Sequence, residues 1–336
     1  MTVRDVIVIG AGPAGLATAI AAGKRGLSCR ILEKGALVNS LLHYPTEMVF
    51  FTTPELMEIG GLPFVSPHDK PTRLEALRYY RRATETYSLD VVFDETVVAI
   101  VREDGVPEDV GAFVVDTHSP RAVRRSCRAR TVVIATGAYD VPNMLGVPGE
   151  DLPYVSHYFP QPHPYFRKRV VVVGGKNSAA ETSLDLYRAG ARVTLVHRHP
   201  VLSDSIKYWV KPDIENRIKE GSIEAHFSTR VVEIRPTTVV VEHEQVVSEL
   251  PADAVFLMTG YRSDTRLLHE AGVQIDPETC GPVFDANTYE TNVPGLYVAG
   301  AVIAGVQSGR IFIENGRFHG EQVIQTVAAR LGAAGA

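Results

Sequence analysis

Two stretches of the chain share one pattern: an unbroken apolar run, a glycine-rich turn, and then a long run of small and apolar residues. A continuous apolar run is typical of a parallel strand that is covered on both faces. The residues after each turn predict a helix, and a second apolar strand follows each helix. The chain therefore contains two β-α-β units. Their predicted strand, helix and strand are residues 5–9, 13–24 and 28–32 in the first, and 170–173, 178–188 and 192–196 in the second.

Between residues 36 and 72 the periodicity stops, and the segment is rich in aromatic residues, Pro and Gly. A long loop without repeating structure beside a ligand site is usually functional. Two interpretations stay open: the segment covers the ring system of a bound cofactor and shapes a substrate opening, or it is an apolar flap that only covers core.

The rest of the chain alternates between further strands and two helices. The helix at 73–87 has Leu74, Leu77, Tyr80 and either Ala83 or Thr84 on one side. Six prolines make residues 142–164 an extended connector. A final helix begins near Ile311. The remaining predicted strands are 91–101, 113–117, 131–135, 222–226, 231–234, 238–243, 254–258 and 296–300.

An apolar strand followed by Thr-Gly occurs twice, at 136–137 and 259–260. This pattern resembles that of flavin disulfide-reductase-like folds, and the resemblance implies that the chain crosses between domains at these two points. The second β-α-β unit is then an insertion into a discontinuous first domain. We predict an α/β protein with two Rossmann-like, three-layer ββα nucleotide-binding domains. The first domain comprises residues 1–138 and 260–336, and the second residues 139–259.

Composition narrows the class of protein. The 336 residues are 45% hydrophobic and 22% charged, with a net charge of −5, as in an ordinary globular protein of two domains. This charge offers no basic surface, so we expect no nucleic-acid partner. The apolar stretch 6–22 resembles a membrane span, but its glycines have phosphate-loop spacing, Asp5 precedes it and Lys24 ends it. We expect no membrane association and a cytoplasmic protein.

The three cysteines, Cys29, Cys127 and Cys280, are scattered and form no CxxC pair. This spacing argues against a local redox disulfide and against a metal knuckle, and we predict no metal site. Cys29 lies within a predicted strand and is expected to be a core thiol.

The first glycine loop predicts an FAD site. Gly10, Gly12 and Gly15 fit a tight turn and a close approach to a diphosphate, which would rest on the positive end of the helix beginning near Pro13. Glu33 ends the next strand, where an acidic side chain accepts hydrogen bonds from both hydroxyls of an adenosine ribose. The final helix near Ile311 would direct its amides at the pyrimidine end of the flavin.

The second loop differs, because no acidic residue ends its second strand and His197 and Arg198 stand there instead. A carboxylate would repel a 2′-phosphate, whereas Arg198 can bind one, so we predict NADPH rather than NADH. Lys176 is placed to reach the diphosphate. His197 either stacks on adenine or simply ends the strand. Two further cations, Lys207 and Lys211, either extend the phosphate pocket or lie on a solvated helix face.

At this point the chain resembles the thioredoxin-reductase-like flavoproteins, and among them the bacillithiol-disulfide reductases (YpdA-type), nearly end to end. The stretches that carry the resemblance are 10–15, 37–40, 43–46, 174–179 and 312–320. The resemblance implies FAD, NADPH and, as electron acceptor, bacillithiol disulfide. Relatives are often dimers or larger, so it also implies a homo-oligomer.

The resemblance also implies a set of contacts. Thioredoxin reductases carry an Asp in place of Ala301 and a CxxC in the inserted domain, and the subgroup resembled lacks both. His43 and His319 are the nearest candidates for proton transfer, and each is also a common type of structural histidine. The implied FAD contacts are Gly10, Gly12, Pro13, Ala14, Gly15, Glu33, Lys34, Asn39, His43, Val98, Ala135, Thr136, Gly137, Gly300, Ala301, Arg310 and Ile311. The implied NADPH contacts are Gly174, Gly175, Lys176, Asn177, Ser178, Ala179, His197, Arg198 and Gly260.

One position departs from the family. Where bacillithiol-disulfide reductases carry a cysteine thought to attack the disulfide, this chain has Ala14. Alanine cannot form the mixed disulfide that thiol exchange requires. Either the alanine replaces a native cysteine and the molecule is inactive, or this is a natural member with other chemistry.

Three functions therefore remain open. The first is an NADPH-dependent flavin reductase of a low-molecular-weight thiol disulfide, which the subgroup motifs favour. The second is a thiol-independent reductase that passes electrons from NADPH through FAD to a ferredoxin, quinone or oxygen, which Ala14 favours. The third is a non-catalytic sensor that binds FAD but is not reduced by NADPH.

Overall fold

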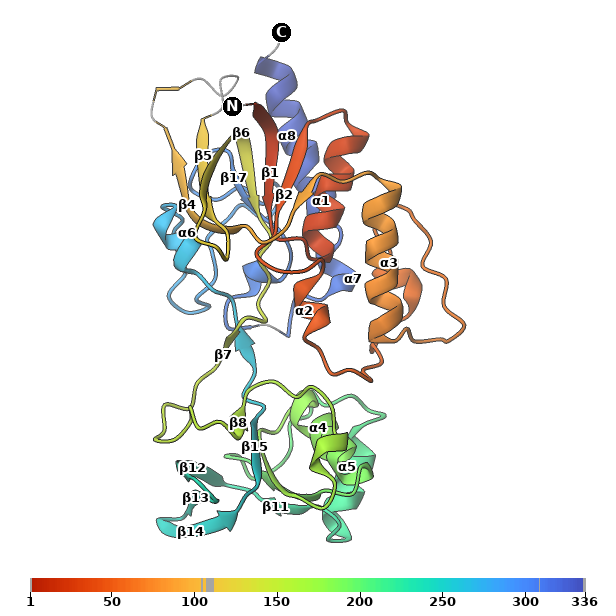
Figure 1. The fold of residues 1–336 in the computed structure, drawn as a ribbon, viewed down its shortest axis with the longest axis vertical. Coiled ribbons are helices and arrows are strands. Elements are labelled where there is room, and N and C mark those ends of the chain that lie inside the picture. Colours follow the sequence, from red (N-terminus) through yellow and green to blue (C-terminus); the bar gives the residue numbers. More distant parts are fainter. Residues whose placement is uncertain (1, 104, 107–111, 308, 335–336) are drawn as a thin grey trace. The chain divides into compact units, whose positions relative to one another are not determined.

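A computed structural model describes residues 2–103, 105–106, 112–307 and 309–334 (Figure 1). The chain divides into two compact units. The first comprises Met1–His43, Glu47–Val141 and Tyr261–Ala336, and the second comprises Tyr44–Thr46 and Pro142–Gly260. Each unit contains a parallel sheet, so the predicted α/β class with two Rossmann-like domains is confirmed.

The first unit is built on a seven-stranded sheet in the order β3-β2-β1-β6-β5-β4, with β17 pairing beside β6. Strands β1, β2, β3, β6 and β17 run parallel, while β4 and β5 run antiparallel. The bounds of its strands are β1 Val3–Ile9, β2 Cys29–Leu32, β3 Val91–Val92, β4 Thr96–Arg102, β5 Phe113–His118, β6 Arg124–Ile134 and β17 Leu296–Val298.

Strand β6 has two different neighbours along one edge. Its first part pairs with β5 as far as Ala129, and its last three residues, beginning at Val132, pair with β17. On this side, β6 therefore has an antiparallel neighbour at its start and a parallel neighbour at its end. The sequence predicted only the second part, residues 131–135.

The helices of the first unit correct two predictions. Helix α3 shows the expected bounds, but its buried face is Ala76, Tyr79, Tyr80 and Ala83, and Leu74 is half exposed. The predicted final helix near Ile311 is instead a four-residue turn, α7, followed by α8. The helical bounds are α1 Pro13–Lys24, α2 Asn39–Leu42, η1 Pro54–Met57, α3 Arg73–Thr86, α6 Arg266–Glu270, η4 Gly300–Ala304, α7 Ile313–Gly316 and α8 His319–Ala334.

The second unit has a five-stranded parallel sheet, in the order β11-β10-β9-β15-β8, and a separate antiparallel sheet, in the order β12-β13-β14. Strand β14 and helix α5 were not predicted, because the exposed strand lacks an apolar alternation and the helix is largely polar. Short strands β7 Val141–Pro142 and β16 Tyr261–Arg262 stand at the two chain crossings. The other bounds are β8 Val155–Ser156, η3 His163–Tyr165, β9 Arg169–Val173, α4 Asn177–Arg188, β10 Arg192–Val196, α5 Lys211–Lys219, β11 Glu224–His226, β12 Thr229–Arg235, β13 Thr238–His243, β14 Val246–Pro251 and β15 Ala254–Leu257.

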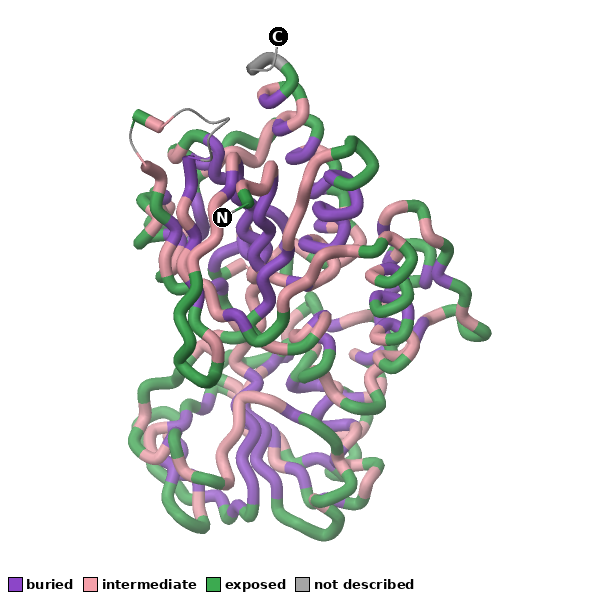
Figure 2. Tube along the Cα trace, turned by 45° about the horizontal axis from the view of Figure 1, so that its top comes forward, coloured by how far each residue is buried: buried purple, intermediate pink, exposed green. Residues whose placement is uncertain are grey.

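Strand β9 shows why its apolar run is continuous. Val170 and Val172 pack into a core formed with the helices, while Val171 and Val173 pack against strands β12 and β13. Both faces of the strand are covered, so alternation with polar residues is lost. Figure 2 shows buried residues along the strands of both units. These layers of helix, parallel sheet and antiparallel sheet form the predicted three-layer arrangement.

Candidate functional site

The first glycine loop joins β1 to α1, and its glycines are required by their surroundings. Gly10 has φ +105°, and a Cβ there would stand 2.6 Å from the carbonyl oxygen of Ala135. A Cβ on Gly15 would collide with the carbonyl oxygen of Gly10. Close packing of strand against helix therefore allows only glycine at both positions.

Gly12 has a different role, because among the described residues nothing lies within 4 Å of where its Cβ would stand. It caps α1, no side chain bonds to the first turn, and Pro13 occupies the first turn without needing a hydrogen-bond partner. The free amides and the positive end of the helix dipole suit a diphosphate. The loop therefore presents backbone amides and an open helix start to a diphosphate.

Glu33, at the end of β2, is buried and fixed in direction. Its carboxylate accepts hydrogen bonds from the amide of Ala11 at 2.7 Å and from that of Gly35 at 2.9 Å. Two backbone donors leave further lone pairs on the two carboxylate oxygens. These oxygens can accept the hydroxyl groups of a ribose, as the sequence predicts.

Ala14, in the first turn of α1, lies against Gly300. A Cβ on Gly300 would stand 2.6 Å from the methyl group of Ala14, and Gly300 has φ +76°. The carbonyl oxygen of Ala14 accepts the hydroxyl of Thr18 at 2.8 Å. The family's nucleophile position is therefore in contact with the turn that follows β17, and only a methyl group is present there.

His319 holds that same turn. Its Nδ1 accepts the amide of Gly300 at 3.1 Å, and its ring stacks on Tyr289 with centroids 4.5 Å apart. Burial lowers the pKa of His319 to about 4, so the ring is neutral and its proton stands on Nε2. His319 accordingly acts as a structural acceptor, one of the two interpretations of this histidine.

The carboxyl ends of three neighbouring strands bring distant predicted contacts together. Ala135 donates its amide to Ile9 at 2.8 Å, and Ala299 donates to Ile134 at 3.0 Å. Gly10, Thr136 and Gly300 therefore follow adjacent strands. Gly137, with φ +76°, continues from Thr136, and Ala301 lies within η4.

The remaining predicted FAD contacts are spread around this edge. Lys34 is paired with Asp140 at 2.5 Å. Asn39 accepts the amide of Ala36 at 3.3 Å, and its carbonyl oxygen lies 2.8 Å from Nδ1 of His43.

Three other predicted contacts lie on less regular structure. Val98 is exposed at a bulge of β4. Arg310 and Ile311 precede α7, which has only four residues, so the long helix predicted to begin near Ile311 begins at His319 instead.

The aromatic segment 47–64 is held firmly in place by the first unit. The hydroxyl of Tyr79 bonds to the backbone of Ile59 and Leu62, and that of Tyr80 donates to Met57. Arg317 donates to the carbonyl oxygens of Glu55 and Glu58 at 2.7 and 2.8 Å. Sequence reasoning missed these anchors, since hydroxyl and guanidinium groups that bind backbone leave no periodic signal.

The second glycine loop joins β9 to α4. Gly174 has φ +149°, and a Cβ there would stand 2.6 Å from the carbonyl oxygen of Met258 and 2.9 Å from the methyl group of Ala179. The ring of His197 lies so close over Gly175 that any side chain there would collide with it. His197 therefore packs on the loop itself, and burial, with the neighbouring cations second, lowers its pKa.

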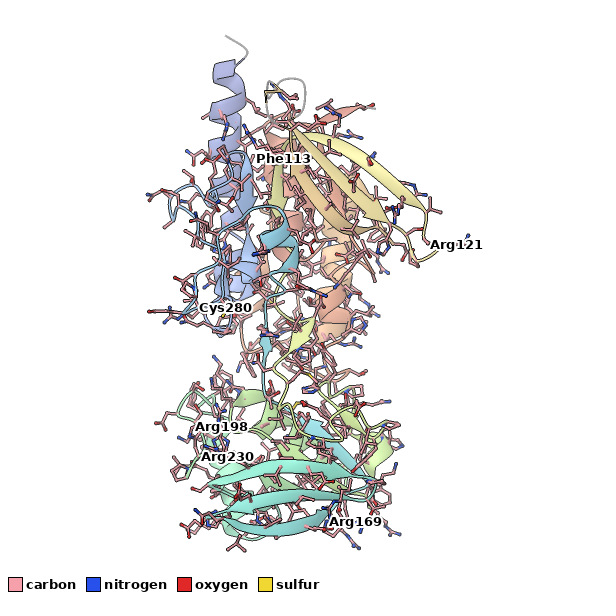
Figure 3. The ribbon with its side chains drawn as sticks, turned by 90° about the vertical axis from the view of Figure 1, so that its left-hand side faces the viewer. Phe113, Arg121, Arg169, Arg198, Arg230 and Cys280 are labelled. Atoms are coloured by element: carbon pink, nitrogen blue, oxygen red, sulfur yellow. The ribbon has the colours of Figure 1, made fainter. Side chains whose placement is uncertain are left out.

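Two arginines, Arg198 and Arg230, lie near one another in the second unit (Figure 3). Arg198 is exposed, and its Nε donates to His199 at 3.3 Å. The amide of Thr229 donates to the carbonyl oxygen of His197 at 3.0 Å, and Arg230 is the next residue. Within the described part of the chain no carboxylate is paired with Arg198, and a phosphate fits this group. Lys211, in contrast, is paired with Asp204 at 2.6 Å.

The other predicted NADPH contacts divide into two kinds. Lys176 and Ser178 are exposed at the start of α4, while Ala179 is buried in the packing of helix against strand. Gly260 follows β15 with φ +87° and accepts the amide of Asn143 at 2.9 Å. The side chain of Asn177 does not point at open space, because it binds protein backbone.

The three cysteines are free. Burial raises the pKa of Cys29 to about 12, so this thiol is inert, as expected of a core residue. Cys127 lies on β6 and Cys280 is exposed.

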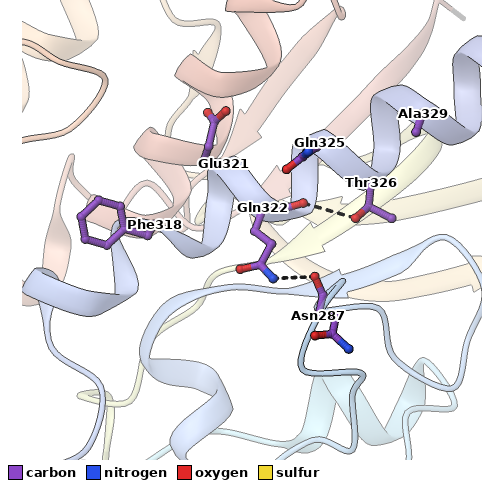
Figure 4. A pocket seen from close by; sticks show the side chains of 7 residues that line it. All are labelled: Asn287, Phe318, Glu321, Gln322, Gln325, Thr326 and Ala329. Carbon is purple, nitrogen blue, oxygen red and sulfur yellow. Dashed lines mark hydrogen bonds between the residues drawn. The ribbon is translucent and has the colours of Figure 1, made fainter.

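A separate groove of about 650 Å³ lies along α8 (Figure 4). It shares no residue with either glycine loop, and Gln322 on its wall donates to the carbonyl oxygen of Asn287 at 2.5 Å. Among the described residues, no helix is long and apolar enough to cross a membrane.

Comparison with known proteins identifies the family. A family model described as pyridine nucleotide-disulphide oxidoreductase matches residues 7–300. The chain belongs to this family. Bacilliredoxin reductase Bdr of Bacillus subtilis (strain 168) is 41% identical over 331 residues, which cover 98% of this chain and 99% of that protein.

Two solved structures agree. The bacillithiol disulfide reductase Bdr (YpdA) from Bacillus cereus has a TM-score of 0.94 at 42% identity and covers 98% of this chain and 100% of that one. The Staphylococcus aureus protein has a TM-score of 0.91 at 36% identity, with 98% and 99% covered. The resemblance seen in the sequence is thus confirmed: the protein is an oxidoreductase of the disulfide-reductase type, with a flavin and a pyridine nucleotide as its cofactors.

Proposed function

We propose that this protein is an NADPH-dependent FAD enzyme that reduces a low-molecular-weight thiol disulfide, with bacillithiol disulfide as the substrate. The observation that carries the proposal is the difference between the two glycine loops of one chain. The first ends at a buried carboxylate, Glu33, and the second at a cation, Arg198. The relatives named for bacillithiol disulfide and bacilliredoxin reduction support the choice of acceptor.

The chain's own residues have distinct tasks in this reaction. Glu33 would bind the ribose of FAD, and the amides after Gly12 its diphosphate. Arg198 would bind the 2′-phosphate of NADPH by charge-assisted hydrogen bonds. When bound, the flavin would supply two-electron redox chemistry between the nicotinamide and the acceptor. Orientation of the reacting groups is the protein's main contribution.

Ala14 favours a second candidate function. A disulfide is cleaved by attack of a thiolate on sulfur, and the methyl group at this position has no lone pair to attack with. A thiol-independent reductase of a ferredoxin, quinone or oxygen needs no residue of that kind. The relatives favour the first function and Ala14 the second.

Substitution of Ala14 by cysteine separates the two functions. NADPH is added anaerobically and the flavin absorbance near about 450 nm is followed, and turnover of bacillithiol disulfide is then measured. We expect flavin bleaching in both proteins, and disulfide turnover at least about 10-fold faster in Ala14→Cys because a nucleophile is restored. Ala329→Cys, which adds the same thiol at an exposed site on α8, serves as the matched control.

Other outcomes decide against the proposal. Bleaching with oxygen or quinone reduction, and no disulfide turnover even in Ala14→Cys, would establish the thiol-independent reductase. Bound FAD that NADPH does not reduce would instead identify a non-catalytic sensor.

A further inference from the structure

Asn177 is the first residue of α4, and the sequence places it among the NADPH contacts. Its side-chain oxygen accepts the amide of Lys207 at 2.9 Å, and its side-chain nitrogen donates to the carbonyl oxygen of Ser205 at 3.1 Å. Both ends of the amide group are therefore engaged by one short segment, residues 203–207. This side chain therefore holds protein backbone on both sides.

The same segment is attached to the glycine loop at a second point. The amide of Ser203 donates to the carbonyl oxygen of Gly175 at 3.0 Å. Within the segment, the hydroxyls of Ser203 and Ser205 lie 2.8 Å apart, and the amide of Ser205 donates to the hydroxyl of Ser203 at 3.2 Å. Residues 203–207 therefore form an ordered turn that is fixed on residues 175 and 177.

Gly175 is also the residue at which His197, the neighbour of Arg198, contacts the glycine loop. The ring of His197 packs on Gly175, and Arg198 is the next residue. The turn at 203–207 and the ring of His197 thus contact the glycine loop at one and the same residue, and Arg198 follows His197 in the chain. Within the turn, the carboxylate of Asp204 is paired with Lys211, a cation that offsets part of its negative charge.

We propose that Asn177 is a positioning residue that sets the 2′-phosphate pocket of NADPH. It holds the hydroxyls of Ser203 and Ser205 beside Arg198, so that a phosphomonoester receives hydroxyl donors and a cation together. The inference rests on the proposed use of NADPH. It adds that selectivity for the phosphorylated nucleotide depends on a residue that does not touch the phosphate.

Two nucleotide fragments test the proposal without any turnover. 2′,5′-ADP carries the 2′-phosphate and 5′-AMP lacks it, and calorimetry measures the affinity of the purified flavoprotein for each. In Asn177→Ala we expect the affinity for 2′,5′-ADP to fall about 10-fold and that for 5′-AMP to change by less than about 2-fold, since one positioned set of hydrogen bonds is lost. Asn177→Asp keeps the acceptor for Lys207, but it sets a carboxylate oxygen against the carbonyl oxygen of Ser205 and adds a negative charge beside the pocket, so its loss should be at least as large.

Controls separate positioning from general damage. Asn216→Ala removes the same side chain from an exposed position on α5 and should bind both fragments normally. The double variant Asn177→Ala with Arg198→Ala should bind 2′,5′-ADP little more weakly than Arg198→Ala alone, because both changes affect one pocket. The KM for NADPH, but not for NADH, should rise in Asn177→Ala while kcat is unchanged.

Three results would overturn the proposal. Equal weakening of both fragments would show that Asn177 only stabilises the start of α4. Unchanged affinity for 2′,5′-ADP would show that the turn at 203–207 keeps its position without the side chain of Asn177. If the unaltered protein bound both fragments equally well, the proposed preference for NADPH would be wrong, and so would the role of Asn177. FAD binding and flavin reduction by NADH would then still support the rest of the proposed function.

Discussion

The two glycine loops have one backbone plan and opposite chemistry at the end of the following strand. After β2 stands the buried carboxylate of Glu33, which is held by the amides of Ala11 and Gly35. After β10 stand His197 and Arg198, with Arg198 exposed. A fixed carboxylate selects two hydroxyl groups, and a cation selects a phosphate. Under the proposed function, the shared turn would bind a diphosphate in either unit, and the residue at the strand end would set which nucleotide can follow.

The loops also differ in how they are supported. In the first, the helix start is open at Gly12, and the surrounding contacts come from the ends of neighbouring strands. In the second, a ring covers Gly175 and a side chain at position 177 holds a separate turn. The first loop is completed by its own sheet, whereas the second depends on a segment that follows it in the chain.

Glu33→Gln should break the first half of this comparison and has the largest expected effect. The new amide nitrogen would face the amide of Ala11 or Gly35, so one hydrogen bond becomes a donor-donor contact in a buried site. We expect at least about 100-fold weaker FAD binding, measured as flavin retained after dialysis and by titration of the apoprotein. Binding of 2′,5′-ADP should be unchanged. Full retention of FAD would show that this carboxylate does not select the ribose.

Arg198→Ala tests the second half, with an intermediate effect. Loss of one charge-assisted contact to phosphate should lower the preference for NADPH over NADH by about 10-fold to 100-fold, measured as the ratio of kcat/KM values. Retained FAD should match that of the unaltered protein. A preference that stays the same would assign 2′-phosphate recognition to other residues.

His319→Asn should have a smaller effect than the two substitutions above, and this effect is on how stability depends on pH. Its asparagine oxygen can replace Nδ1 as acceptor for Gly300, so the turn is kept while the titrating ring is lost. The pKa of His319 is about 4 in the fold against about 6.5 in an unfolded chain, so the unfolded state takes up the proton first as pH falls. Stability is therefore lost between about pH 6.5 and 4, by at most roughly 3 kcal/mol.

The measurement is the free energy of unfolding in denaturant at several pH values. The difference between about pH 7 and pH 4.5 should be smaller in His319→Asn than in the unaltered protein. His197, beside the second loop, also has a pKa lowered by burial, but it is less enclosed, so His197→Asn should change the slope less. Identical slopes in all three proteins would contradict this assignment.

Much of this architecture could be predicted from the sequence because it follows from local rules. Glycines at fixed spacing after an apolar run predict the two β-α-β units, and β10 has the predicted bounds. Both faces of β9 are buried, which the continuous run of valines predicts. Placement of Glu33 and Arg198 at strand ends followed from the same count.

The rest depends on contacts between residues far apart in the sequence. The interruption between α7 and α8 is accompanied by Arg317, which binds the carbonyl oxygens of Glu55 and Glu58, and no local pattern reports such a partner. Tyr80 and Ala83 are buried as their spacing predicts, but Tyr79 is buried in place of Leu74, and its hydroxyl donates to Leu62 in the segment before the helix. The role of Asn177 was hidden for the same reason.

The position of β17 in the chain determines when the sheet of the first unit can be completed. This strand completes the edge of β6, but it lies after the whole of the second unit in the chain. On the ribosome, the parallel sheet of the second unit, within Pro142–Gly260, is finished while the edge of the first is still missing a strand. The sheet of the first unit therefore gains its last strand only after the whole second unit has been synthesised, by a contact between residues far apart in the chain.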